Sequence, residues 1–134
     1  MEPWAQLDIF RTSGTNDVGY VAGLLGLEST GDIVDWRAAR GMIPAVGAQR
    51  SWVLSSAGQV PSRALRPHVD RLLQAIAGKE TEIARLRAEG YWVCATFHYV
   101  WPDAPDPAEV KAVDAELEAR DITFDLELER DDFP

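Results

Sequence analysis

The stretch YWVCATFHYV, residues 91–100, decides the fold because it predicts a long β-strand in the second half of the chain. Its β-branched and aromatic residues favour an extended backbone, and successive side chains then point to opposite faces. The more polar face carries Trp92, Cys94, Thr96, His98 and Val100. The face predicted to lie against the core carries Tyr91, Val93, Ala95, Phe97, Tyr99 and Trp101.

Cys94 and His98 invite comparison with a Cys/His reaction centre, but a strand keeps them apart. Residues four apart in a strand stand about 13 Å from each other, at about 3.3 Å per residue. A thiol and an imidazole must approach to about 3.2 Å to share a proton. The pair is therefore not a nucleophile and its base, and Cys94 is predicted to be a small, half-buried residue.

The two histidines have separate expectations. If the last strand of the chain lies beside residues 91–100, His98 faces Asp125 or Glu127 across the ladder. Such a contact is either a surface cross-strand pair or a pH-sensitive acid–base pair. His68 lies near a helix start without an evident partner, and it is predicted to be exposed.

The elements around this strand alternate in type. Strands are predicted at residues 4–12, 50–56 and 122–129, from alternating apolar positions. Helices are predicted at 18–25, ending at Gly26, at 65–89, with a kink at Gly78, and at 107–120, with Asp106 as N-cap. Residues 29–49 fit either a short edge strand or a long loop.

This order predicts an α+β fold with a mixed β-sheet and helices packed mainly on one face. The style is ferredoxin-like, with an added C-terminal helix and strand. The 134 residues suffice for a single domain, 1–134. The start of the chain has no pattern of a secretory signal, and no apolar run approaches the about 20 residues that span a bilayer. We expect a cytoplasmic protein.

The net charge of −9 is concentrated at the end of the chain. Up to Pro102 acidic and basic residues balance, whereas from Asp103 onward twelve acids face only Lys111, Arg120 and Arg130. This charge repels nucleic acid and anionic membranes and attracts a basic protein; alternatively it is a solvated face that aids solubility. The predicted partner-binding acids are Asp125, Glu127, Glu129, Asp131 and Asp132.

A second candidate site combines indole and guanidinium groups around the segment 29–49. Arginine beside tryptophan holds anions or stacks on planar ligands. The residues of this candidate cleft are Trp36, Arg37, Arg40, Arg50 and Trp52, with His98 as the proton carrier. The alternative is that the tryptophans anchor a loop and the arginines are solvated.

No motif for covalent catalysis, phosphate binding or dinucleotide binding occurs. Two histidines and one cysteine give no zinc-type spacing. The sequence therefore predicts no catalytic residues, no metal and no cofactor.

Several stretches together resemble a bacterial family known as domain of unknown function 4279. They are VAGLLGLEST, where Ser29 replaces the family's usual proline, RSWVLSS, RAEGYWVCATFHY and ARDITFDLELE. The resemblance covers about Leu7 to Glu129 and implies a fold rather than an activity, since the family has no agreed one.

Three functions remain open. The favoured one is a non-catalytic protein-interaction module of the inhibitor, adaptor or immunity type, with a basic protein as partner. The alternatives are a small-molecule-binding protein or enzyme that uses the Trp/Arg cleft, and a structural homodimer.

Overall fold

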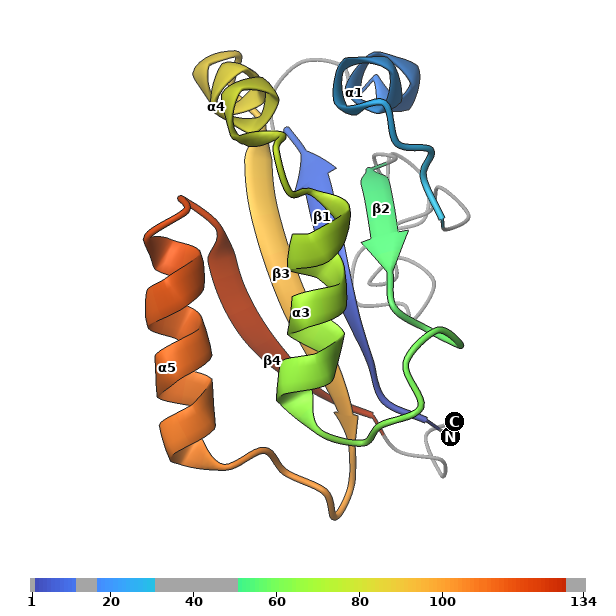
Figure 1. Ribbon diagram of the computed structural model, residues 1–134, viewed down its shortest axis with the longest axis vertical. Helices are drawn as coiled ribbons and strands as arrows, with labels where there is room; N and C mark the ends of the chain where they lie inside the picture. The colour runs from blue at the N-terminus through green and yellow to red at the C-terminus, as the bar shows by residue number, and fades with distance from the viewer. Residues whose placement is uncertain (1, 12–16, 31–50, 130–134) are drawn as a thin grey trace. The chain divides into compact units, whose positions relative to one another are not determined.

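The structure is a computed structural model that describes residues 2–11, 17–30 and 51–129 (Figure 1). In chain order the elements are β1 (Trp4–Phe10), α1 (Val18–Leu25), β2 (Trp52–Ser55), α3 (Leu65–Ala75), α4 (Glu80–Ala88), β3 (Trp92–Val100), α5 (Pro107–Glu118) and β4 (Thr123–Glu129). The strands form one sheet in the order β2-β1-β3-β4. β3 and β4 run parallel, whereas β1 runs opposite to β3 (Figure 1). The predicted α+β fold with a mixed sheet is confirmed.

The chain divides into two compact units that interleave along the sequence. The first unit comprises Met1–Leu7, Ser55–Ala77 and Cys94–Pro134, and the second comprises Asp8–Leu54 and Gly78–Val93. The expectation of one domain, 1–134, stays a prediction.

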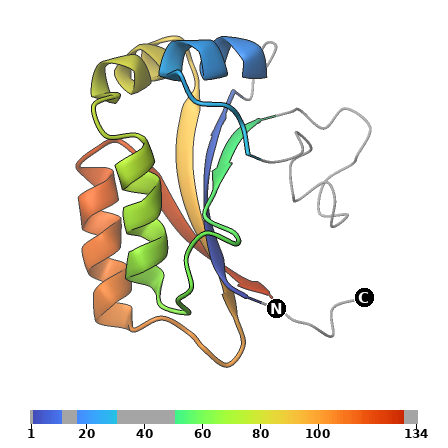
Figure 2. The ribbon, with the colours of Figure 1, turned by 45° about the vertical axis from the view of Figure 1, so that its right-hand side comes forward.

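The core of the first unit lies between one face of the sheet and the helices α3 and α5, which lie side by side (Figure 2). Phe97 of β3 is fully buried, and its ring contacts that of His68 on α3 at a centroid distance of 5.7 Å. Val113 and Leu117 are the buried residues of α5. Phe97 thus lies on the predicted core face of β3, together with the buried Val93 and Ala95. Trp101, predicted on the same face, is 64% exposed, because it lies beyond the end of the strand.

Most of the other face of β3 is buried as well, although its polarity predicts otherwise; Trp92, its first residue, is 49% exposed. Thr96, His98 and Val100 are all buried, while Cys94 is half-buried as predicted. Polar residues occupy this buried face because His98 finds a carboxylate partner within the first unit, as described below.

β4 is the edge strand of the sheet beside β3. Its register pairs Thr96 with Asp125, Phe97 with Leu126 and His98 with Glu127, in each case by Cα position. The alternating apolar side chains of this strand are only partly buried. Phe124 and Leu128 are half-buried, and Leu126 is 37% exposed. An edge position explains this exposure, since β3 is the one strand beside β4 in the described part of the chain.

The predicted long helix 65–89 is wrong: it is two helices, α3 and α4, which belong to different units. Gly78 lies between them with φ of 79°, a left-handed conformation that glycine adopts without steric cost and that a continuing helix excludes. Gly26 ends α1 in the same way, with φ of 68°, as predicted.

The second unit contains α1 and α4, which contact each other. Trp52 of β2 is fully buried there, and its Nε1 donates a hydrogen bond to the carbonyl of Leu27 at 2.9 Å. On the surface of this unit, the hydroxyl of Tyr20 donates to the carboxylate of Glu89 at 2.6 Å, which raises the pKa of Tyr20.

α5 begins as its sequence predicts. The Asp106 carboxylate accepts a hydrogen bond from the backbone N–H of Ala108 at 2.9 Å, and Pro107 occupies the first turn. The Glu109 side chain, in the first turn of α5, accepts a hydrogen bond from the backbone N–H of Arg66 at 3.0 Å. An acid at this position therefore joins α5 to the start of α3.

Replacing Asp106 by alanine should lower the free energy of unfolding by about 1 kcal/mol, because the N-cap bond is lost. Urea denaturation followed by circular dichroism measures this change. Asp114→Ala, the same substitution inside α5, is the control and should not destabilise the protein, since alanine has the higher helix propensity. Equal losses in the two variants would contradict the cap assignment.

Candidate functional site

The five acids predicted to bind a partner do not share one environment. Asp125 is exposed on β4 and Glu127 is half-buried. Glu129 is 1% exposed, so its assignment to an acidic surface is corrected. Asp131 and Asp132 lie outside the residues that the structure describes.

Glu129 is buried because it pairs with His98. Its Oε1 lies 2.8 Å from Nδ1 of His98, and the histidine side chain is fully buried. Trp4 of β1 stacks on the imidazole, with ring centroids 4.3 Å apart and planes within 8°. The expectation that His98 meets an acid of the last strand is therefore right in kind. The partner is Glu129 rather than Asp125 or Glu127, and the pair is buried rather than at the surface.

The second histidine also differs from its prediction. His68 is 1% exposed, not solvent-facing. Its Nδ1 lies 2.6 Å from Oγ of Ser56, and its Nε2 lies 2.7 Å from the carbonyl oxygen of Ser62. The carbonyl can only accept, so Nε2 carries the proton and Nδ1 accepts from the serine hydroxyl.

This Ser56–His68 pair has the spacing of a nucleophile and its base, but its surroundings fit a structural role. Ser56 is fully buried, and its Oγ also accepts a hydrogen bond from the backbone N–H of Ala5 at 2.8 Å. The Ser56 hydroxyl is thus buried and makes a hydrogen bond on each side. The pair fastens β1 and the end of β2 to α3 within the first unit.

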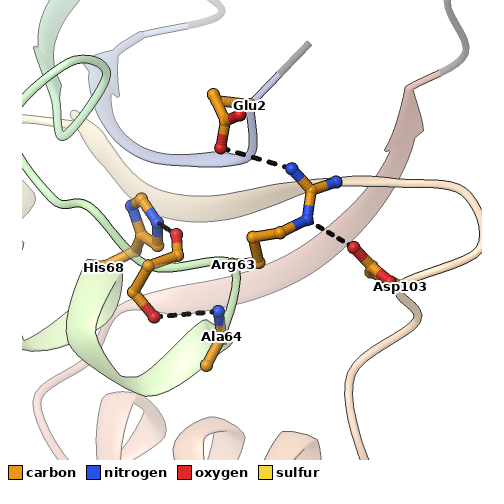
Figure 3. Close-up of polar contacts among 6 residues, drawn as sticks. Glu2, Arg63, Ala64, His68 and Asp103 are labelled. Carbon is orange, nitrogen blue, oxygen red and sulfur yellow. Dashed lines mark hydrogen bonds and ion pairs between the residues drawn. The ribbon is translucent and has the colours of Figure 1, made fainter.

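Part of the C-terminal acidic charge is neutralised by Arg63, which precedes α3, and by Arg66 in its first turn. The guanidinium of Arg63 lies between Glu2 and Asp103 (Figure 3). Arg66 pairs with Glu116 of α5 and with Asp70, and the hydrogen bond with Glu116 raises the pKa of Arg66. Of these acids only Glu116 joins α5 to α3, but none of them is available to a partner without breaking an ion pair.

The flank of α5 opposite to Glu116 carries two acids that no described arginine or lysine pairs with. The buried Leu117 marks the side of the helix that faces the core. At about 100° per residue, Glu116 lies on one side of Leu117, toward Arg66 of α3, and Glu118 lies on the other. Asp114 precedes Glu118 by one turn and shares its flank. Both are exposed, and neither is in an ion pair among the described residues.

Both acids lie at positions where their charge destabilises the helix. Like charges four residues apart repel each other by a few tenths of a kcal/mol. Glu118 is also the last residue of α5, where the helix dipole favours a cation, and the last turn contains no basic residue. Sequence reasoning missed Asp114 and Glu118, although their i, i+4 spacing within a predicted helix was a readable signal.

We call Asp114, Glu118, Asp125 and Glu127 the acidic edge. Asp125 and Glu127 belong to β4. By helical periodicity, Asp114 and Glu118 lie on the flank of α5 opposite to the one that carries Glu116 and meets α3. α5 itself packs beside β4, the last strand of the described sheet (Figure 2). None of the four is in an ion pair among the described residues. Asp121, between the two elements, has φ of 60°, a conformation that aspartate tolerates better than most residues, and the turn accounts for it.

Of the residues of the candidate Trp/Arg cleft, the structure describes Trp52 and His98. The others, Trp36, Arg37, Arg40 and Arg50, lie outside the described residues. Trp52 belongs to the second unit and His98 to the first, and both side chains are fully buried. The small-molecule hypothesis therefore stays a prediction. Within residues 2–11, 17–30 and 51–129, no cluster of three or more potential metal ligands occurs.

Among the described helices, none is both long and apolar enough to cross a membrane. Comparisons of the chain with protein-family models, with curated proteins and with solved structures found no match. The resemblance to domain of unknown function 4279 stays a prediction.

Proposed function

We propose that this protein is a non-catalytic interaction module that binds a basic protein through the acidic edge. The single observation that carries the proposal is the set of four acids on α5 and β4, three exposed and Glu127 half-buried, that have no ion-pair partner among the described residues. Nearby acids of the same segment, Asp103 and Glu116, are paired by arginines. The fold thus neutralises one side of α5 and leaves the other negative.

Energetics supports the same conclusion. Asp114 and Glu118 repel each other, and Glu118 also opposes the helix dipole, so the two charges do not stabilise the helix. A cationic partner removes both penalties when it binds. Exposed charges of this kind raise the rate of association more than the affinity, and they repel wrong partners of like charge. An inhibitor, adaptor or immunity protein uses both properties.

The experiment that tests the proposal compares three immobilised proteins in the native cell extract at low salt. They are the wild type, the variant Asp114→Asn/Glu118→Gln, and the control variant Glu28→Gln/Glu80→Gln. Glu28 and Glu80 are exposed acids of the second unit, so the control removes the same charge from elsewhere. Captured proteins are eluted with a salt gradient and identified by mass spectrometry.

The expected result is a basic protein that the wild type and the control retain, and that the edge variant releases at lower salt. The edge variant should also be more stable by a few tenths of a kcal/mol, because the repulsion within α5 is relieved. Loss of binding from a more stable protein excludes misfolding as its cause. Identical elution from all three columns would contradict the proposal.

A further inference from the structure

One side of the β4 backbone pairs with no other strand among residues 2–11, 17–30 and 51–129, and the register shows which residues present it. The carbonyl of Glu129 accepts a hydrogen bond from the N–H of Trp101, at the end of β3. In a parallel pair, the residues whose N–H and C=O face the neighbouring strand alternate. Thr123, Asp125 and Glu127 therefore also face β3 through their backbones.

The intervening residues, Phe124, Leu126 and Leu128, direct their N–H and C=O groups away from β3. β4 is the last strand in the described sheet, so these groups face no described strand. Leu126, in the middle, is the most exposed of the three. An open strand edge of this kind is a template for pairing with another chain.

The charges around this edge determine which kind of strand can pair with β4. Asp125 and Glu127 lie on one face of β4, and α5, with Asp114 and Glu118 on its outer flank, packs on the other. A second copy of this chain that pairs through its own β4 brings like charges opposite each other, which is destabilising. A strand with lysine or arginine at alternate positions finds carboxylates along the edge instead.

We propose that an extended, lysine- or arginine-rich segment of the partner adds to the free edge of β4 as a further strand. The backbone groups of Phe124, Leu126 and Leu128 hold it by hydrogen bonds, and the acidic edge fixes its charge pattern. This inference rests on the proposed function, since it names the part of the basic partner that binds and the way in which it is bound.

The test uses the full chain and a synthetic ten-residue peptide of alternating lysine and valine, observed by amide hydrogen exchange with NMR. In the free protein, the amides of Phe124, Leu126 and Leu128 should exchange faster than those of Asp125 and Glu127, which donate toward β3. Saturating peptide should slow exchange at the three outward amides by at least about tenfold.

Two variants at one position separate backbone pairing from side-chain contact. Leu126→Pro removes an outward N–H without removing a bond to β3, a position at which edge strands tolerate proline. It should raise the Kd of the peptide at least about tenfold. Leu126→Ala keeps the N–H and should change the Kd by less than about threefold. Thermal unfolding of both variants verifies that they fold.

Each outcome bears on a different part of the account. Peptide binding that weakens in Asp114→Asn/Glu118→Gln but leaves the outward amides unprotected would overturn strand addition and spare the proposed function. Retention of a basic protein from the extract without any binding of the peptide would do the same. Protection that rises with protein concentration in the absence of peptide would assign the edge to a second copy and overturn this inference.

Discussion

Replacing Glu129 by alanine should lower the free energy of unfolding by about 3 kcal/mol, the largest effect expected from an acidic residue of the last strand. The carboxylate lies 2.8 Å from Nδ1 of His98, and both side chains are buried. Removing one member of a buried pair leaves the other without its partner and without water. The stacked Trp4 cannot replace the lost acceptor, because its indole donates only.

Urea denaturation measures this loss, with Asp125→Ala as the matched control. Asp125 lies on the same strand and points to the same face, but it is exposed, so its replacement should change stability by no more than about 0.5 kcal/mol. The double variant His98→Phe/Glu129→Leu should recover most of the loss, since an apolar pair of similar size needs no partner. A loss below about 1 kcal/mol in Glu129→Ala would show that the pair is not a buried unit.

Replacing His68 by alanine should also cost about 3 kcal/mol, for two reasons. The substitution leaves a cavity beside Phe97, and it removes the bonds to Ser56 and Ser62. Gln74→Ala, at an exposed position of the same helix, is the control and should be nearly neutral.

A chemical test distinguishes the structural role of the Ser56–His68 pair from a catalytic one. A fluorophosphonate probe modifies serines that a neighbouring base activates. Because Ser56 is fully buried, the folded protein should not be labelled at this residue. Labelling of Ser56 that disappears in His68→Ala would contradict the structural assignment, provided that the variant still folds at the temperature of the assay.

Local patterns predicted most of the fold. The strand 91–100, the αL end of α1 at Gly26 and the N-cap at Asp106 each depend on a few neighbouring residues, and all are observed. The sequence indicated the helix break at Gly78 only in part, because the apolar stripe of α3 resumes in α4. Glycine in a helix costs about 1 kcal/mol, which is compatible with either a kink or an end.

The burial of polar residues was the part that the sequence could not reveal. His68 and Glu129 carry no local sign that they are buried, since their partners Ser56 and His98 are 12 and 31 residues away. Charge counting located the acidic segment but did not separate Glu116, which Arg66 neutralises, from Glu118, which it does not. That division depends on which side of α5 faces α3.

The measurement that tests the central claim most directly is the association rate with the captured basic partner as a function of ionic strength, by surface plasmon resonance. For the wild type and for Glu28→Gln/Glu80→Gln, the rate should fall steeply as salt rises. For Asp114→Asn/Glu118→Gln, the rate at low salt should be lower and its salt dependence shallower, with little change in the dissociation rate. Equal rates and equal slopes for all three proteins would show that the acidic edge does not guide the partner.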